Sequence, residues 1–204
     1  MRRGYHHVYI LLFELILFAG LFLIGVNRYF IKGKIVKASV TKNPKNTSLN
    51  YTTSQQYELL FNAKIKSKLE YASKNFNVAK DKIKVIVDIS EQTAYVYFKN
   101  DKTFKEFTIS TGGPQKQREM PEALWKITEK RDKGLTPLYG PRLLFLSRRL
   151  RNGQFIRTTI ALHGTNTPQI LGTPKSLGCV YFKNTDILKV YNTLQTGDIV
   201  LTIR

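Results

Sequence analysis

Two residues of the chain have the chemistry of a nucleophile and its base. Cys179 is the only cysteine among 204 residues, and His163 is the only histidine outside the N-terminal pair His6 and His7. A thiol reacts as its thiolate, so an imidazole that removes the proton makes it a good nucleophile near neutral pH. The two residues lie 16 positions apart, and a cysteine enzyme built from this chain would have to use this pair.

Glycines flank both candidate residues. Gly178 precedes the thiol, where a missing side chain allows close approach of a substrate carbonyl, and the backbone N–H groups around Cys179 are candidates for an oxyanion hole. Gly164 follows His163, and its carbonyl is a candidate for the group that orients the imidazole. Spacing alone also fits a small buried cysteine and a surface histidine. We expect no metal site, because one cysteine and one histidine are too few ligands for zinc.

The composition indicates a globular chain in anionic surroundings. Apolar residues make up 42% and charged residues 23%, but 33 basic residues against 14 acidic ones give a net charge of +19. The basic residues are densest over 27–82, so we expect this stem to lie on anionic lipid headgroups or another anionic envelope surface. A solvated surface without a partner is the alternative. No DNA- or RNA-binding motif accompanies the charge, so we expect no nucleic-acid partner.

The N-terminus predicts a membrane segment. Residues 8–26 are apolar apart from Glu14, and a helix of this length, at about 1.5 Å per residue, spans a bilayer core of about 30 Å. We therefore predict that residues 1–26 are a membrane anchor, with a cleaved signal peptide as the alternative. Basic residues stand on both sides of the segment, so the positive-inside rule gives no orientation.

Two segments separate this anchor from the rest of the chain. The first, 27–53, is basic and rich in Asn, Ser and Thr toward its end, which predicts a flexible linker. The second, 54–82, is a helical stem. Thr53 and Gln56 have the spacing of a capping box, and apolar residues then recur at helical spacing, which predicts a helix over 54–75.

Residues 83–204 have the pattern of a mainly β domain. Short apolar runs alternate with turn signals, which is typical of a sandwich or barrel, and one further helix is expected at 185–194. The expected strands are 84–89, 93–98, 104–110, 124–128, 143–146, 157–162, 178–182 and 199–203.

The segments around the two candidate residues resemble the signature of the L,D-transpeptidase family, whose catalytic domain is of the YkuD type. The resemblance is carried by His163-Gly164-Thr165, by Ser176-Leu177-Gly178-Cys179-Val180, by Thr111-Gly112-Gly113 upstream and by the closing segment 196–201. It covers about 83–204. It implies a β-sandwich or barrel with one or two short helices and the cysteine in a cleft.

The resemblance implies a reaction and a role for each residue. Cys179 would attack the carbonyl of the third residue of a peptidoglycan tetrapeptide stem, release D-alanine and form a thioester, which an amine of a neighbouring stem resolves into a 3-3 cross-link. His163 would be the base, oriented by the Gly164 carbonyl. The oxyanion site would be shaped by Ser176 and by the N–H groups of Gly178 and Cys179. No cofactor is implied.

Two departures from the family pattern leave the acceptor open. Tyr181 stands where the family usually has arginine, and Met120-Pro121-Glu122-Ala123 replaces the usual Thr-Pro-x-Gly turn. We expect Tyr181 and Thr165 to contact substrate. Loss of the guanidinium removes a partner for a substrate carboxylate, so an L,D-carboxypeptidase or related hydrolase that uses water is the alternative.

A third reading and two further expectations follow from these assignments. A catalytically weak wall-binding scaffold is a third reading of the chain. An enzyme of this family would act in the bacterial cell envelope, on the outer side of the cytoplasmic membrane. If His163 activates Cys179, we expect an apparent thiol pKa below the usual value of about 8.5.

Overall fold

The computed structural model describes residues 52–114, 118–132 and 136–204. The predicted membrane segment at 8–26, and the linker 27–53 up to residue 51, lie outside these ranges. No helix within the described ranges combines the length and the apolar character that a bilayer crossing requires.

The first described element is the helix α2 (Thr53–Phe76). Its capping box is formed by Thr52 and Gln55: the Thr52 hydroxyl accepts the Gln55 N–H at 3.3 Å, and the Gln55 side chain accepts the Thr52 N–H at 3.0 Å. The predicted pair Thr53 and Gln56 was therefore wrong by one position, because Thr53 is already helical.

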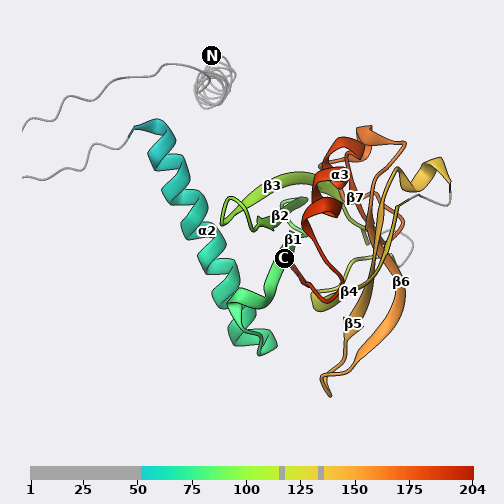
Figure 1. Ribbon diagram of the computed structural model, residues 1–204, viewed down its shortest axis with the longest axis horizontal. Coiled ribbons are helices and arrows are strands. Elements are labelled where there is room, and N and C mark those ends of the chain that lie inside the picture. The colour runs from blue at the N-terminus through green and yellow to red at the C-terminus, as the bar shows by residue number, and fades with distance from the viewer. Residues whose placement is uncertain (1–51, 115–117, 133–135) are drawn as a thin grey trace, which may run out of the picture. The chain divides into compact units, whose positions relative to one another are not determined.

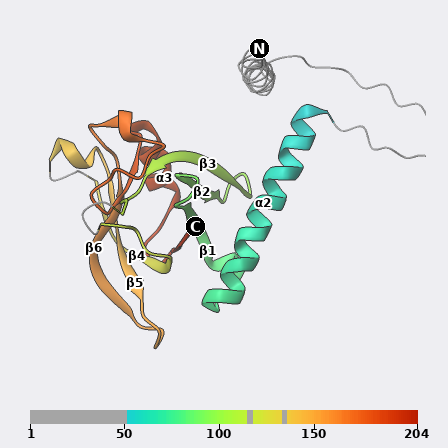
Figure 2. The same cartoon turned by 180° about the vertical axis from the view of Figure 1, so that it is seen from behind.

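The strands of the described ranges close into one barrel (Figures 1 and 2). In chain order they are β1 (Ile83–Asp88), β2 (Thr93–Phe98), β3 (Thr103–Ser110), β4 (Ala123–Arg131), β5 (Leu143–Arg149), β6 (Phe155–His163), β7 (Val180–Phe182) and β8 (Ile199–Ile203). Around the barrel their order is β1-β2-β3-β7-β6-β5-β4-β8. With α2 and the helix α3 (Asn184–Thr193) as the α-helices of these ranges, the mainly β class is confirmed, and α3 is the short helix expected at 185–194.

The barrel has a parallel pairing at the place where the candidate residues lie. β6 and β7 run parallel, with Leu162 opposite Val180 and His163 opposite Tyr181. Parallel neighbours need a crossover, and residues 164–179 supply it, with a 3-10 turn at Pro168–Ile170. The expected strand 178–182 begins only at Val180, because Gly178 has a φ of +116°, which breaks the extended backbone.

Two apolar clusters lie on opposite faces of β1 and β8. The larger contains alternate residues of β1, such as Val85 and Val87, together with Trp125 and the buried side of α3. The smaller is formed on the other face by side chains of the strands and of α2: Ile65, Ala72, Ile83, Ile86, Tyr95, Leu124, Leu201 and Ile203. From Phe61 onward, α2 therefore packs in the same compact unit as the barrel.

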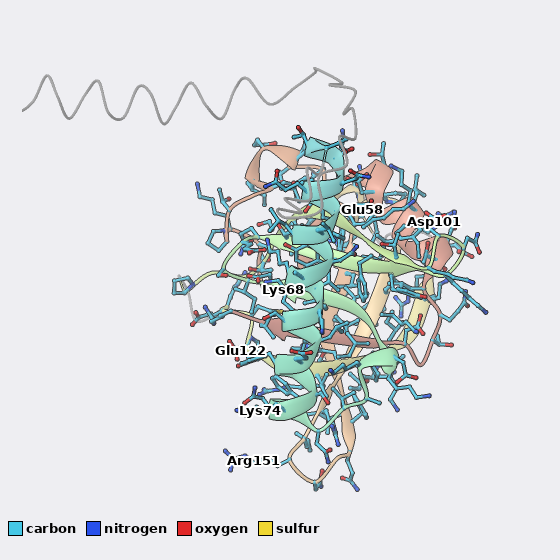
Figure 3. The ribbon with its side chains drawn as sticks, turned by 90° about the vertical axis from the view of Figure 1, so that its left-hand side faces the viewer. Glu58, Lys68, Lys74, Asp101, Glu122 and Arg151 are labelled. Atoms are coloured by element: carbon cyan, nitrogen blue, oxygen red, sulfur yellow. The ribbon has the colours of Figure 1, made fainter. Side chains whose placement is uncertain are left out.

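A buried ion pair also joins α2 to the barrel. Lys68, labelled on α2 in Figure 3, pairs with Asp88 at the end of β1, whose side chain is 3% exposed. Burial alone would raise the pKa of Asp88, but the hydrogen bonds from Lys68, Ser90 and the Glu91 N–H outweigh it and hold the pKa below its usual value. The turn that follows β1 is thus held by a charged carboxylate.

Candidate active site

The parallel pairing of β6 and β7 brings the two candidate residues to the same place in the barrel. His163 lies directly opposite Tyr181, and Cys179 immediately precedes the first residue of β7. The His163 and Tyr181 rings are 4.5 Å apart between centroids, and Tyr139 packs edge-on against the same imidazole at 5.0 Å. The base is therefore held between two aromatic rings.

A short hydrogen bond fixes the tautomer of His163. Its Nδ1 lies 2.5 Å from the Gly164 carbonyl oxygen, which only accepts, so Nδ1 carries the proton. Nε2 then keeps its lone pair. That nitrogen is buried, and no hydrogen-bond partner for it occurs in the described part of the chain. An unpaired buried acceptor is costly, and here it is the atom that a base needs to have free.

The surroundings of His163 keep the imidazole neutral. Burial lowers the pKa of His163 to about 4, and the backbone hydrogen bonds with Gly164 and Tyr139 offset this only in part. At neutral pH the side chain is therefore a base with no proton on Nε2.

This pKa shift predicts a loss of stability in acid. In the unfolded chain the imidazole binds a proton near pH 6.5, whereas the folded chain binds it only near pH 4, so the unfolded state takes up more protons between these values. Lowering the pH from 7 to 4 should cost about 3 kcal/mol of unfolding free energy through His163. Urea unfolding of the wild type and of His163→Gln at several pH values measures this. The other acid-titrating groups are the same in both proteins. If the unfolding free energies of the two proteins change in parallel with pH, the predicted contribution of His163 is contradicted.

Cys179 is half-buried at the start of β7. Its Sγ lies 3.8 Å from the Thr159 carbonyl oxygen, to which the thiol donates. Burial raises the pKa of Cys179, and a backbone hydrogen bond with Ala161 opposes the shift without cancelling it. The expected thiol pKa below the usual value was therefore wrong for this resting geometry. Both shifts favour the neutral forms, a protonated thiol and an uncharged imidazole.

Ser176 shapes the loop that carries the nucleophile. Its hydroxyl donates to the Cys179 carbonyl oxygen at 2.5 Å and accepts the Gly178 N–H at 3.2 Å, while its own N–H donates to the Thr111 carbonyl oxygen at 3.0 Å. Because the Gly178 N–H is already engaged, the Cys179 N–H is the better candidate for an oxyanion donor. Ser176 holds the turn around the thiol from inside.

A glycine on the neighbouring loop makes this packing possible. Gly112 lies in the segment that follows β3. A Cβ on this residue would overlap the Arg118 carbonyl oxygen and crowd Gly178, so the loop that carries Cys179 could not pack against this segment if Gly112 had a side chain. Gly112 also forms an isolated bridge with Ser176.

The two residues expected to contact substrate occupy other roles in the structure. Tyr181 is 4% exposed and lies under the loop, against His163, which favours a role in holding the imidazole. Thr165 is buried; its N–H donates to the Asn184 side chain at 2.9 Å, and its hydroxyl lies 2.9 Å from that of Thr167. Both residues are buried and present little surface to a ligand, and Tyr181 packs against the base.

Three residues of the site were missed in the sequence. Tyr139 lies on a 3-10 turn just before β5, and the antiparallel pairing that places Leu143 opposite His163 brings its ring to the imidazole. Gln92 binds the Thr111 hydroxyl through its buried side-chain amide. Arg118 is exposed, and its carbonyl lies beside Gly112. Burial raises the pKa of Tyr181, and the positive charge of Arg118 opposes this shift. An isolated arginine in a polar segment carries no sequence signal of such a place.

Within the described ranges, no three His, Cys, Asp or Glu side chains gather into a group that could hold a metal ion. The chemistry available at this place is that of a thiol, a buried imidazole and backbone N–H groups. A barrel that holds the imidazole at the end of one strand and the thiol just before the adjacent parallel strand defines a candidate cysteine acyltransferase or hydrolase.

Comparison with known families identifies the domain. The family model of the L,D-transpeptidase catalytic domain, YkuD, matches residues 82–202. The chain belongs to this family, as its sequence motifs suggested. No curated protein matches the chain.

Solved structures similar to the chain are also L,D-transpeptidases. One from Mycobacterium tuberculosis is 20% identical, with 59% of this chain and 57% of that chain covered and a TM-score of 0.42. The C442S mutant from Enterococcus faecium is 16% identical, with 59% and 49% covered and a TM-score of 0.45. One from Stackebrandtia nassauensis is 27% identical, with 59% and 54% covered and a TM-score of 0.41. The chain thus spans about half of the length of these structures.

Proposed function

We propose that the protein is a cell-wall L,D-transpeptidase in which Cys179 is the nucleophile and His163 the base. The observation that carries the proposal is the buried imidazole whose Nε2 is free to accept a proton, on the strand next to the nucleophile. The donor would be a peptidoglycan tetrapeptide stem, as in the family.

The proposed reaction has two halves. In the first, the Cys179 sulfur attacks the carbonyl carbon of the third stem residue while His163 Nε2 takes the thiol proton. The C–S bond forms, the C–N bond to D-alanine breaks, and the proton passes from His163 to the leaving amine. In the second, an amine of a neighbouring stem gives up a proton to His163 and attacks the thioester. A C–N bond forms, the C–S bond breaks, and the proton passes from His163 to the sulfur, which regenerates the thiol.

Neutral forms of both groups suit this scheme. A thiol with a raised pKa stays protonated until substrate arrives, and a neutral imidazole is ready to take its proton. Arg118 is exposed and its carbonyl oxygen lies near Gly178, so its guanidinium is a candidate partner for the carboxylate at the end of a stem peptide.

The acceptor is the open half of the proposal. A hydrolase would use water in the second step and leave a tripeptide. The replacement of the usual arginine by Tyr181 first suggested this alternative, but Tyr181 is buried against His163, so the substitution changes the support of the base more than the cleft surface. We therefore favour an amine acceptor.

Product analysis tests the proposal. Incubation of the full chain with disaccharide-tetrapeptide fragments should give cross-linked dimers and free D-alanine, read by mass spectrometry. Tripeptide monomers without dimers would show hydrolysis and overturn the transfer step. If neither product forms, the wall-binding scaffold becomes the better explanation.

The proposed substrate sets the proposed location. Peptidoglycan stems lie in the bacterial cell envelope, so the catalytic domain (83–204) would act outside the cytoplasmic membrane. The anchor at 1–26 and contacts of the basic linker and stem with anionic headgroups remain part of this proposal. Protease added to cells stripped of their outer layers should digest the domain, and its protection would place it in the cytoplasm.

A further inference from the structure

We infer that Gln92 is a positioning residue for the Cys179 loop: its buried side-chain amide holds Thr111, and Thr111 holds Ser176. The inference deepens the proposed function and rests on it for its catalytic consequence. Gln92 contacts neither the thiol nor the imidazole through any hydrogen bond recorded for the described residues, so its effect would be transmitted through the loop.

The amide of Gln92 makes three hydrogen bonds. Nε2 donates to the Ile89 carbonyl oxygen at 2.6 Å and to the Thr111 hydroxyl at 2.8 Å, and Oε1 accepts the Thr111 N–H at 2.8 Å. Gln92 is 4% exposed and Thr111 fully buried, so no solvent replaces these bonds if the amide is removed. The amide therefore fixes both polar groups of Thr111 that point toward it.

Thr111 in turn fixes the loop of the nucleophile. Its carbonyl oxygen accepts the Ser176 N–H at 3.0 Å, and the Ser176 hydroxyl then bonds both the Gly178 N–H and the Cys179 carbonyl oxygen. The path from Gln92 to the peptide of Cys179 is thus continuous through two residues. A shift of Thr111 would move the thiol and its N–H together.

The backbone of Gln92 shows that its place is strongly determined. Its φ is +51°, in the left-handed region that a residue with a side chain rarely adopts. The turn before it is held by Asp88, which accepts from the Ser90 hydroxyl at 2.6 Å and the Glu91 N–H at 2.9 Å. This unfavourable backbone geometry, together with a carboxylate that holds the turn, aims the amide at Thr111.

A second anchor keeps the other end of the loop in place. The Ser110 hydroxyl donates to the Thr173 carbonyl oxygen at 2.6 Å, and the Gly172 N–H donates to the Ile109 carbonyl oxygen at 2.8 Å. Loss of the Gln92 amide should therefore loosen the end of the loop near Cys179 without unfolding the crossover.

The test compares Gln92→Met with Thr202→Val in the full chain. Methionine matches the length of glutamine without its hydrogen bonds. Thr202 is a buried hydrogen-bonding residue on β8 that binds the Trp125 indole at 3.0 Å and the Ala123 N–H at 2.9 Å, so its valine variant is a matched loss of buried hydrogen bonds outside the loop. Both variants are measured by hydrogen exchange and by the rate of acyl-adduct formation with tetrapeptide fragments.

In Gln92→Met we expect the amides of Ser176 and Gly178 to exchange at least about tenfold faster than in the wild type. Adduct formation should fall by about 100-fold, the effect of a displacement of about 1 Å at a reacting group. Thr202→Val should leave exchange in 173–179 unchanged and the adduct rate within about twofold. If Gln92→Met does not fold, Thr111→Val replaces it. Valine removes only the hydroxyl that accepts from Gln92 Nε2, so a smaller increase in exchange is expected.

Wild-type exchange at Ser176 and Gly178 in the Gln92 variant would overturn the inference, and so would faster exchange with an unchanged adduct rate. Equal effects in Thr202→Val would also overturn it, since they would reflect general destabilisation. A wild-type protein that forms no adduct would instead overturn the proposed function, and exchange alone would then decide whether Gln92 positions the loop.

Discussion

Replacing Cys179 with alanine is expected to abolish acyl-adduct formation with tetrapeptide stems, a loss of at least about 10⁴-fold that brings the rate below detection. The chain has no second thiol that could take over. The remaining groups of the site, an imidazole and backbone N–H groups, can polarise a carbonyl but cannot form a thioester with it. Intact-protein mass spectrometry after mixing with the stem fragment measures the adduct directly.

The control for this variant is its fold. Cys179 is only half-buried and donates one weak hydrogen bond to Thr159, so alanine should change the midpoint of thermal unfolding by a few degrees at most. Cys179→Ser keeps the shape of the side chain but has a hydroxyl that is harder to deprotonate, and it should also be inactive. An adduct that persists in the folded alanine variant would show that Cys179 is not the nucleophile. Release of D-alanine by that variant would contradict the proposed enzymatic mechanism.

Replacing His163 with glutamine is expected to lower the rate of adduct formation by about 10²–10⁴-fold, the usual contribution of a general base. Burial raises the pKa of the Cys179 thiol, so without a base few molecules carry a thiolate at neutral pH. In the wild type the rate should stay high as the pH falls from 7 and decline only near pH 4, where His163 takes up its proton. Adduct rates across pH 3–9 for both proteins give these values.

Alkylation of the thiol provides the control for His163→Gln. Iodoacetamide reacts with the thiolate, so at a pH above the thiol pKa both proteins should be labelled at similar rates, which shows that the thiol is equally accessible in each. Because burial raises the pKa of the Cys179 thiol, the apparent pKa of the wild type should lie above that of a free cysteine. If the adduct rate of the wild type instead declines near pH 6.5, the low pKa of His163 in the substrate-free protein does not hold in the reacting state.

Much of the fold was predictable because its strands have strong local signals. The ends of β2 and β8 coincide with the predicted ranges, where apolar and β-branched residues meet clear turn residues. β7 was predicted too long, since the left-handed backbone at Gly178 is imposed by the packing of its loop. The closure of the barrel depends on pairings between distant segments, for which a single sequence holds little information.

The site was predictable only where chemistry is rare. One cysteine and one histidine in the body of the chain could be paired by elimination, and the glycines beside them by motif. The residues that hold them could not, because Tyr139 and Gln92 reach the site through tertiary contacts, and neither residue type is unusual where it stands. The role of Tyr181 beneath the loop likewise depends on its strand register with His163.

The packing of α2 decides where the gene can be cut for expression. A fragment beginning at residue 83 would follow the predicted domain boundary, yet it would uncover the apolar outer face of β1 and β8, including Ile86 and Leu201, and leave Asp88 without its lysine. Such a fragment exposes a contiguous apolar surface and leaves the Asp88 carboxylate without its cationic partner, which favours aggregation. We therefore expect a soluble recombinant form to need α2 from Phe61 onward, so this part of the stem belongs to the folded domain and cannot be treated as a tether.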